Sequence, residues 1–120
     1  MSEQAQALAA RLEQAHSALL AVLTACSEND WRKGAGNDAR SVGVITHHVA
    51  AGDAFVLGLA QEVAAGRPLP ALTWEMVHQG NAQHAQQQAG CAKEETLDLL
   101  REFGVDHVQG FHIGRPTLLE

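Results

Sequence analysis

Apolar residues recur every three or four positions along the first 26 residues of the chain. They would share one side of an α-helix, and they are Leu8, Leu12, Ala15, Leu19, Val22, Leu23 and Cys26. Ser2 and Glu3 provide a start signal, because a serine can cap the first turn and an acidic residue favours the positive end of the helix dipole. The pattern predicts a long amphipathic helix from about Ser2 to Cys26.

A second long helix is predicted after Ser41, where a valine returns every seven residues. We call this repeat the valine stripe; it consists of Val42, Val49, Val56 and Val63. The stripe is flanked by Ile45, His48, Gly52, Phe55 and Leu59. The combined pattern predicts a buried side on this helix. Ser41 can cap its start, and Gly66 with the prolines that follow ends it.

A third helix is predicted from Thr73, a capping residue, to about Ala89. Its apolar residues cluster in the first turn, so its inward side must carry polar groups such as Asn81 and His84.

A short fourth helix runs from Lys93 to Phe103, with Gly104 as its stop signal. The remaining residues, 105–120, show no helical period. They contain two further glycines and a proline, which predicts an extended or irregular tail.

These elements predict an all-α fold, an incomplete up-and-down bundle over residues 1–103. Trp31, in the first connection, is expected to cover one end of the bundle. The irregular tail, residues 104–120, is expected to pack on the bundle or on a second subunit. Because an unmatched apolar flank is commonly closed by a second copy across a two-fold axis, we expect a homodimer.

The composition removes several classes of function. The 120 residues are 46% hydrophobic and 18% charged, as in ordinary globular chains, and the formal net charge of -6 argues against a nucleic-acid surface. No apolar run approaches the roughly 18 residues of a membrane span, and the N-terminus lacks the regions of a signal peptide. Cys26 and Cys91 have no CxxC partner and are expected to be free thiols. We therefore expect a cytoplasmic protein that binds neither nucleic acid nor membrane.

Histidine is the residue type in surplus, with seven in the chain. His48 is predicted on the buried side of the second helix, where an unpaired imidazole would cost about 1 to 3 kcal/mol. It should therefore have a partner, either a hydrogen bond in the core or a metal ion held between helices. His47 lies about 100° further round that helix and is expected to be more exposed. His16 follows Leu12 by one turn and could point inward.

The other histidines form no local metal motif. His78 and His84 are six residues apart, and His107 and His112 are five apart, so neither pair shares a helix face well. The chain has no HExxH, HxxxH or paired-carboxylate spacing. Spacing alone therefore favours hydrogen-bonded core histidines over a metal site.

Several segments resemble the DinB-like superfamily, four-helix bundles that include thiol-dependent transferases and maleylpyruvate isomerases. The segments are Asp30-Trp31, Arg40–Ala50 (RSVGVITHHVA), Gly52–Phe55 (GDAF), Ala65–Pro70 (AGRPLP), Asn81–Ala85 (NAQHA) and Lys93–Arg101 (KEETLDLLR). The resemblance covers about residues 5–103 and implies a shortened DinB-like bundle. Arg40 stands where a tryptophan is common in that superfamily.

The resemblance also implies a metal ligand. One histidine of the second helix, followed by an apolar residue and an alanine, ligates a divalent metal in the superfamily, and His48 matches that position. The other two ligands usually come from an HxxxH on a later helix, which this chain lacks. His84, His107, His112 or a second subunit remain as sources of further ligands, with zinc or nickel as the metal.

The segment Phe103–Pro116 (FGVDHVQGFHIGRP) resembles the closing segment of an EAL cyclic-diguanylate phosphodiesterase domain. The likeness covers the tail alone, without the strands that hold that family's metal-binding carboxylates. It therefore implies no phosphodiesterase activity.

Two functions follow as expectations. The first is a dimeric, non-catalytic module that binds a small ligand or a partner, because only one of the three ligands usual for a catalytic zinc site is matched. The second is a metal-dependent enzyme of the thiol transferase or isomerase type, in which the ion activates a bound thiol or water. No catalytic residue is assigned. Under either function the expected pocket lies between the second and third helices, lined by His48, Gly52, Phe55, Asn81 and His84.

Overall fold

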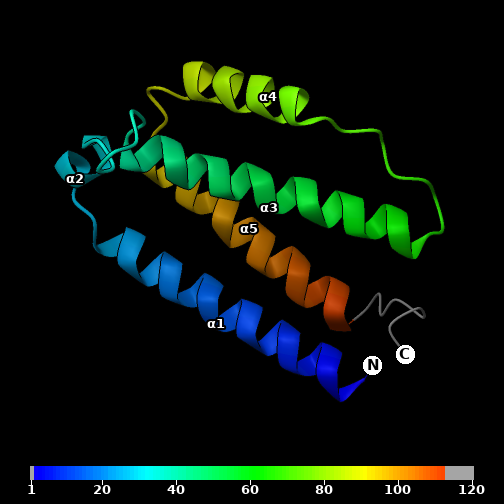
Figure 1. The fold of residues 1–120 in the computed structure, drawn as a ribbon. Helices are drawn as coiled ribbons and strands as arrows, with labels where there is room; N and C mark the ends of the chain where they lie inside the picture. Colours follow the sequence, from blue (N-terminus) through cyan, green and yellow to red (C-terminus); the bar gives the residue numbers. More distant parts are fainter. Residues whose placement is uncertain (1, 113–120) are drawn as a thin grey trace. The chain divides into compact units, whose positions relative to one another are not determined.

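The computed structural model describes the backbone of residues 2–112 and the side chains of residues 2–103. It contains five helices: α1 (Glu3–Ala25), α2 (Glu28–Arg32), α3 (Val42–Ala64), α4 (Trp74–Gln87) and α5 (Lys93–His112) (Figure 1). No strand is present in residues 2–112, where a single β-bridge joins Gly34 and Ser41. The all-α prediction is confirmed.

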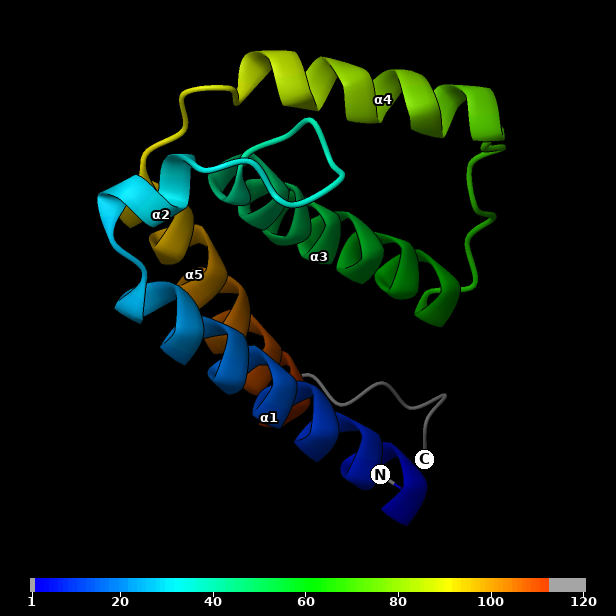
Figure 2. The ribbon, with the colours of Figure 1, turned by 60° about the vertical axis from the view of Figure 1, so that its left-hand side comes forward.

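Two compact units divide the chain. One comprises Met1–Ala25 with Leu97–Glu120, and the other comprises Cys26–Thr96. The first unit holds α1 and the part of α5 from Leu97 onward, which lie side by side and antiparallel (Figures 1 and 2). The second unit holds α2, α3 and α4, and α3 contacts both of the others.

In the first unit, the buried side of α1 differs from the predicted one. Leu8, Leu12 and Val22 are exposed, whereas Leu23 is buried. The half-buried residues that share the side of Leu23 are Ala5, Ala9, His16, Leu19 and Leu20. The His16 ring packs against Phe103 of α5, with ring centroids 5.9 Å apart. The inward position considered for His16 is therefore confirmed. The predicted stripe is confirmed at Leu19 and Leu23 but is wrong at Leu8, Leu12 and Val22.

In the second unit, Trp31 is the central buried side chain, with 1% of its surface exposed. A capping box of Ser27 and Asp30 starts α2 and presents the indole inward. Its Nε1 donates a hydrogen bond of 3.0 Å to the carbonyl of Cys91, sixty residues further along the chain. Its ring lies so close to Gly43 that a Cβ there would be 2.4 Å from Nε1. Trp31 thus joins α2, the start of α3 and the connection from α4 to α5.

Both ends of α3 form as predicted. The Ser41 side chain accepts a hydrogen bond of 3.1 Å from the Val44 amide. At the other end Gly66 has a φ of 73°, and its amide donates to Val63 while the Arg67 amide donates to Glu62. These two bonds form a Schellman motif, which needs a residue that tolerates positive φ. Thr73 caps α4 in the same way as Ser41 caps α3.

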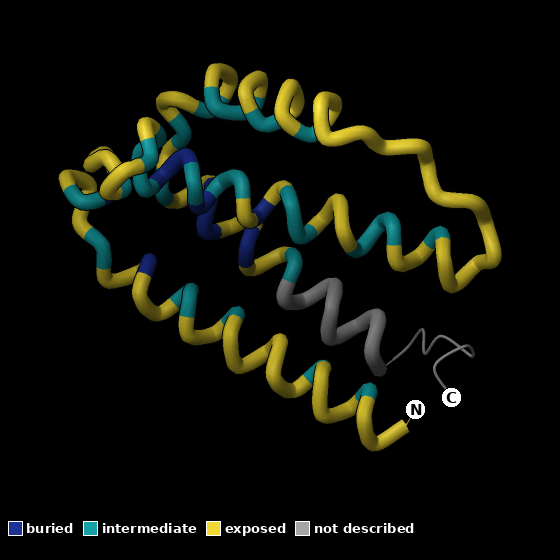
Figure 3. The backbone as a smooth tube through the Cα atoms, viewed as in Figure 1, coloured by how far each residue is buried: buried dark blue, intermediate teal, exposed yellow. Residues whose placement is uncertain are grey.

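The valine stripe does not form the buried side of α3. Val49, Val56 and Val63 are exposed, the last two by 62% and 55%, and Phe55 is 54% exposed. The buried residues of α3 are Gly43, Val44, Thr46 and Ala50, all in its first half (Figure 3). The predicted side is therefore wrong at the exposed valines and Phe55, although its other residues, Ile45, His48, Gly52 and Leu59, are half-buried. At the start of α3 the buried side is the one where Gly43 lets the Trp31 ring approach.

α3 also has the length and apolarity of a membrane-crossing helix, although no apolar run of that length was expected from the sequence. It is the one such helix among the described residues. Core helices of soluble proteins share these properties, so they do not by themselves place the chain in a membrane.

α5 continues through Gly104 to His112, so the predicted helix end and irregular tail are wrong over residues 104–112. An interior glycine costs a helix only about 1 kcal/mol relative to alanine. It ends a helix when it also adopts positive φ and receives capping bonds, as Gly66 does. The packing expected for the tail, and the side chains of His107 and His112, lie outside the described residues.

We predict that Gly43→Ala lowers the free energy of unfolding by about 1 to 3 kcal/mol. The added methyl would overlap a Trp31 ring that is held by burial and a hydrogen bond. Urea unfolding followed by circular dichroism measures the change.

Gly58→Ala is the matched control on the same helix. A Cβ at Gly58 would have no neighbour within 4 Å, so this variant should gain about 0.5 to 1 kcal/mol of helix stability. Equal stability of Gly43→Ala and the wild type would show that the Trp31 contact does not constrain α3.

Candidate functional site

Three imidazole rings meet between α3 and α4, within the second unit. We call His47, His48 and His84 the histidine cluster. His47 Nδ1 and His84 Nε2 are 2.8 Å apart, a hydrogen bond between two rings whose centroids are separated by 4.9 Å. The His48 ring stands edge-on to His84, with centroids 5.4 Å apart and planes inclined at 70°.

Burial and charge both favour neutral rings in this cluster. Burial lowers the pKa of His47 below its usual value. The pKa of His84 is lowered first by burial, and then by the positive charge that His47, His48 and Arg40 can carry nearby. Because a hydrogen bond between two ring nitrogens needs one bare acceptor, at least one of the bonded rings must be neutral. The neutral form is therefore favoured at His47 and His84.

Arg40, one of the charges that lower the pKa of His84, is held by the loop before α3. Its guanidinium donates to both carboxylate oxygens of Asp38, with Nη2 to Oδ2 at 2.7 Å. These bonds lower the pKa of Asp38 to about 2. The loop itself turns at Gly36, which has a φ of 63°.

One nitrogen of the cluster is left without a partner. Nδ1 of His84 is buried and makes no hydrogen bond. An unsatisfied buried polar atom costs about 1 to 3 kcal/mol, so this atom is a candidate contact for a bound molecule. Nε2 of His16, in the other unit, is unsatisfied in the same way.

The structure brings together two of the residues selected from the sequence, His48 and His84. His47, which was expected to be more exposed than His48, is half-buried as His48 is, and it is bonded to His84. The reason is that α4 packs over the side of α3 on which His47 lies. Two features of the sequence indicated the contact between His47 and His84. One is the adjacent pair of histidines on the second predicted helix, and the other is the polar inward side of the third.

The other predicted lining residues are less closely associated with the cluster. Asn81 and Gly52 are half-buried, whereas Phe55 is mostly exposed. His78 packs on Trp74, with ring centroids 6.3 Å apart. The side chain of His112 lies outside the described residues.

The donor set has the chemistry that zinc or nickel prefers, because neutral imidazole is a common ligand of both. Its arrangement does not fit an ion as it stands. Among the described side chains, no group of three or more histidines, cysteines or carboxylates is placed to hold a metal ion. In the cluster, two of the three rings are instead bonded to each other.

No protein-family model, curated protein or solved structure matches this chain. The DinB-like resemblance therefore depends on the sequence motifs alone.

We predict that the melting temperature falls as the pH is lowered from about 7.5 to about 5.5. His47 and His84 have a lower pKa in the folded protein than in the unfolded chain, which takes up protons first as the pH drops through 6.5. The stability conferred by the neutral rings is therefore present above that pH and is lost below it. Differential scanning fluorimetry across this range measures the dependence.

His84→Gln should weaken this pH dependence, because glutamine can bond to His47 without titrating. His78→Gln, on the same helix but outside the cluster, is the control and should retain the wild-type slope. An unchanged slope in His84→Gln would exclude His84 as its source.

Proposed function

We propose that this chain is a shortened DinB-like helical bundle that acts as a dimeric, non-catalytic binding module. The observation that carries the proposal is the hydrogen bond between His47 and His84. It uses one nitrogen of each ring to connect α3 with α4, so the histidine cluster acts first as a structural contact. A small ligand with a polar group would bind beside it and take the unpartnered Nδ1 of His84 as its contact.

Dimer formation is supported by the valine stripe. Val49, Val56 and Val63 are exposed and recur every seven residues along one side of α3. Charged residues are sparse on this helix, which has only Asp53 and Glu62. A seven-residue repeat of β-branched residues is typical of helices that pair with a second copy. The stripe thus offers a symmetric surface of the kind that closes homodimers.

A divalent-metal-dependent enzyme is the second candidate. It is favoured by the proximity of His48, the residue that matches the superfamily ligand, to His84, and by the lowered pKa of His84, since a metal ligand must be a neutral imidazole. His47, His48 and His84 would have to separate and reorient to hold the ion, which when bound would make a thiol or water more acidic.

Metal titration distinguishes the two candidates. We predict that chelator-treated, dialysed protein shows no saturable binding of zinc or nickel at one ion per chain in isothermal titration calorimetry. Its melting temperature should also stay unchanged on adding either ion.

The contrary result would be one ion bound per chain in the wild type and in His78→Ala, but not in His48→Ala. That outcome would establish the metal-dependent alternative, and thiol-transfer assays would then follow.

We also predict that the wild-type chain sediments as a dimer and that Val56→Lys shifts it toward monomer. A lysine in the middle of the valine stripe would place a charge in the proposed interface, and two copies would repel each other. Sedimentation velocity over a range of concentrations measures the equilibrium. Val22→Lys, an equally exposed valine on α1, is the control. A wild-type monomer at all concentrations would contradict the proposed assembly.

A further inference from the structure

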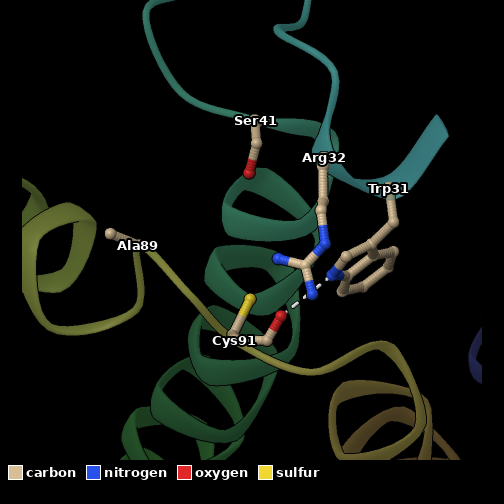
Figure 4. A pocket seen from close by; sticks show the side chains of 5 residues that line it. All are labelled: Trp31, Arg32, Ser41, Ala89 and Cys91. Atoms are coloured by element: carbon tan, nitrogen blue, oxygen red, sulfur yellow. Dashed lines mark hydrogen bonds between the residues drawn. The ribbon is translucent and has the colours of Figure 1, made fainter. Parts of the chain in front are cut away.

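A small cavity of about 230 Å³ lies at the junction of α2, α3 and the connection to α5, within the second unit and apart from the histidine cluster. Five residues line it: Trp31, Arg32, Ser41, Ala89 and Cys91. Figure 4 shows the Arg32 guanidinium and the Cys91 sulfur directed into the space below Ser41, with the Trp31 indole beside them.

The walls of this cavity are held in place by contacts already described. The indole of Trp31 is buried against Gly43 and bonded to the Cys91 carbonyl, so the same contact positions the backbone that carries the thiol. The Ser41 hydroxyl accepts from the Val44 amide at the start of the 23-residue α3. Its hydroxyl hydrogen remains available to donate.

The charge in the cavity is positive and unbalanced. Arg32 is the one charged residue among the five that line it. Its cationic neighbours have acidic partners, since Lys33 pairs with Asp30 and Arg40 with Asp38. Among the described side chains, Arg32 makes no ion pair. An exposed guanidinium at the mouth of a cavity can therefore bind an incoming anion with two parallel hydrogen bonds.

We propose that this cavity binds a small carboxylate, held by the guanidinium of Arg32 and the hydroxyl of Ser41, and places it against the thiol of Cys91. The volume suits a ligand of a few heavy atoms. The adjacent indole supplies an apolar wall for its carbon atoms. A carboxylate that carries an electrophilic carbon would accordingly be directed to Cys91.

The experiment compares alkylation of Cys91 by iodoacetate, an anion, and by iodoacetamide, its neutral analogue. In each reaction the thiolate sulfur forms a bond to the methylene carbon and iodide departs with the electron pair of the broken C–I bond. Because both reagents meet the same thiol, the ratio of their rates cancels the intrinsic reactivity of that thiol. Cys26, the other free cysteine, is the reference within the same molecule.

We predict that the iodoacetate-to-iodoacetamide rate ratio is about tenfold higher at Cys91 than at Cys26, as a charge-assisted hydrogen bond would give. The rates are measured by mass spectrometry of peptides from the intact folded protein. Added sodium acetate should slow the iodoacetate reaction at Cys91 by competing for the site.

Arg32→Gln should reduce the ratio at Cys91 to that at Cys26, whereas Lys33→Gln, which removes the same charge one residue away, should preserve it. Arg32 is exposed, so its replacement should leave the fold intact, as circular dichroism would verify. Equal ratios at the two cysteines of the wild type, or a raised ratio that persists in Arg32→Gln, would overturn the proposal.

Discussion

The burial of one indole ring holds the second unit together. Trp31 brings three chain segments into contact, because its ring packs on Gly43, its Nε1 bonds to the Cys91 carbonyl, and its own helix, α2, is fastened by a capping box. Each segment depends on the others, since a side chain at position 43 would displace the ring. The cavity beside Cys91 exists because the ring fills one side of the junction and leaves the other to Arg32 and Ser41.

α4 is attached to α3 in a different way. None of its residues is buried, and Trp74 is 79% exposed, so burial of apolar surface contributes little to its docking. The imidazole contacts of His84 with His47 and His48 lie in this interface. A proton taken up by His47 or His84 would therefore alter a contact between α3 and α4.

The acidic chain neutralises many of its cations locally. Lys33 with Asp30, Arg40 with Asp38, Arg67 with Glu62 and Arg101 with Asp98 are each close neighbours in sequence. Such exposed pairs add little stability, typically below about 1 kcal/mol. Their main effect here is on the distribution of charge, because Arg32, which lines the cavity, has no ion pair with any side chain of residues 2–103.

The sequence alone was sufficient to locate the four longer helices and most of their ends, but it missed α2, which lies in the predicted first connection. Ser2, Ser41, Thr73 and Gly66 act through hydrogen bonds within a few residues of themselves, so local pattern predicts them. The helix end predicted at Gly104 was wrong. A glycine ends a helix only when it adopts positive φ and receives capping bonds, and the residue type alone does not show whether it does.

Tertiary structure decided which side of each helix is buried and which histidines meet. α3 is apolar around most of its circumference, so its seven-residue repeat could not select one side. At the start of α3, Trp31 packs on the side where Gly43 lacks a side chain. With that side chosen, α4 packs over His47 as well as His48, and Arg32 meets Cys91. The residues of each pair are separated by tens of residues in the chain. The periodicity within one helix does not encode which residues of another segment it will contact.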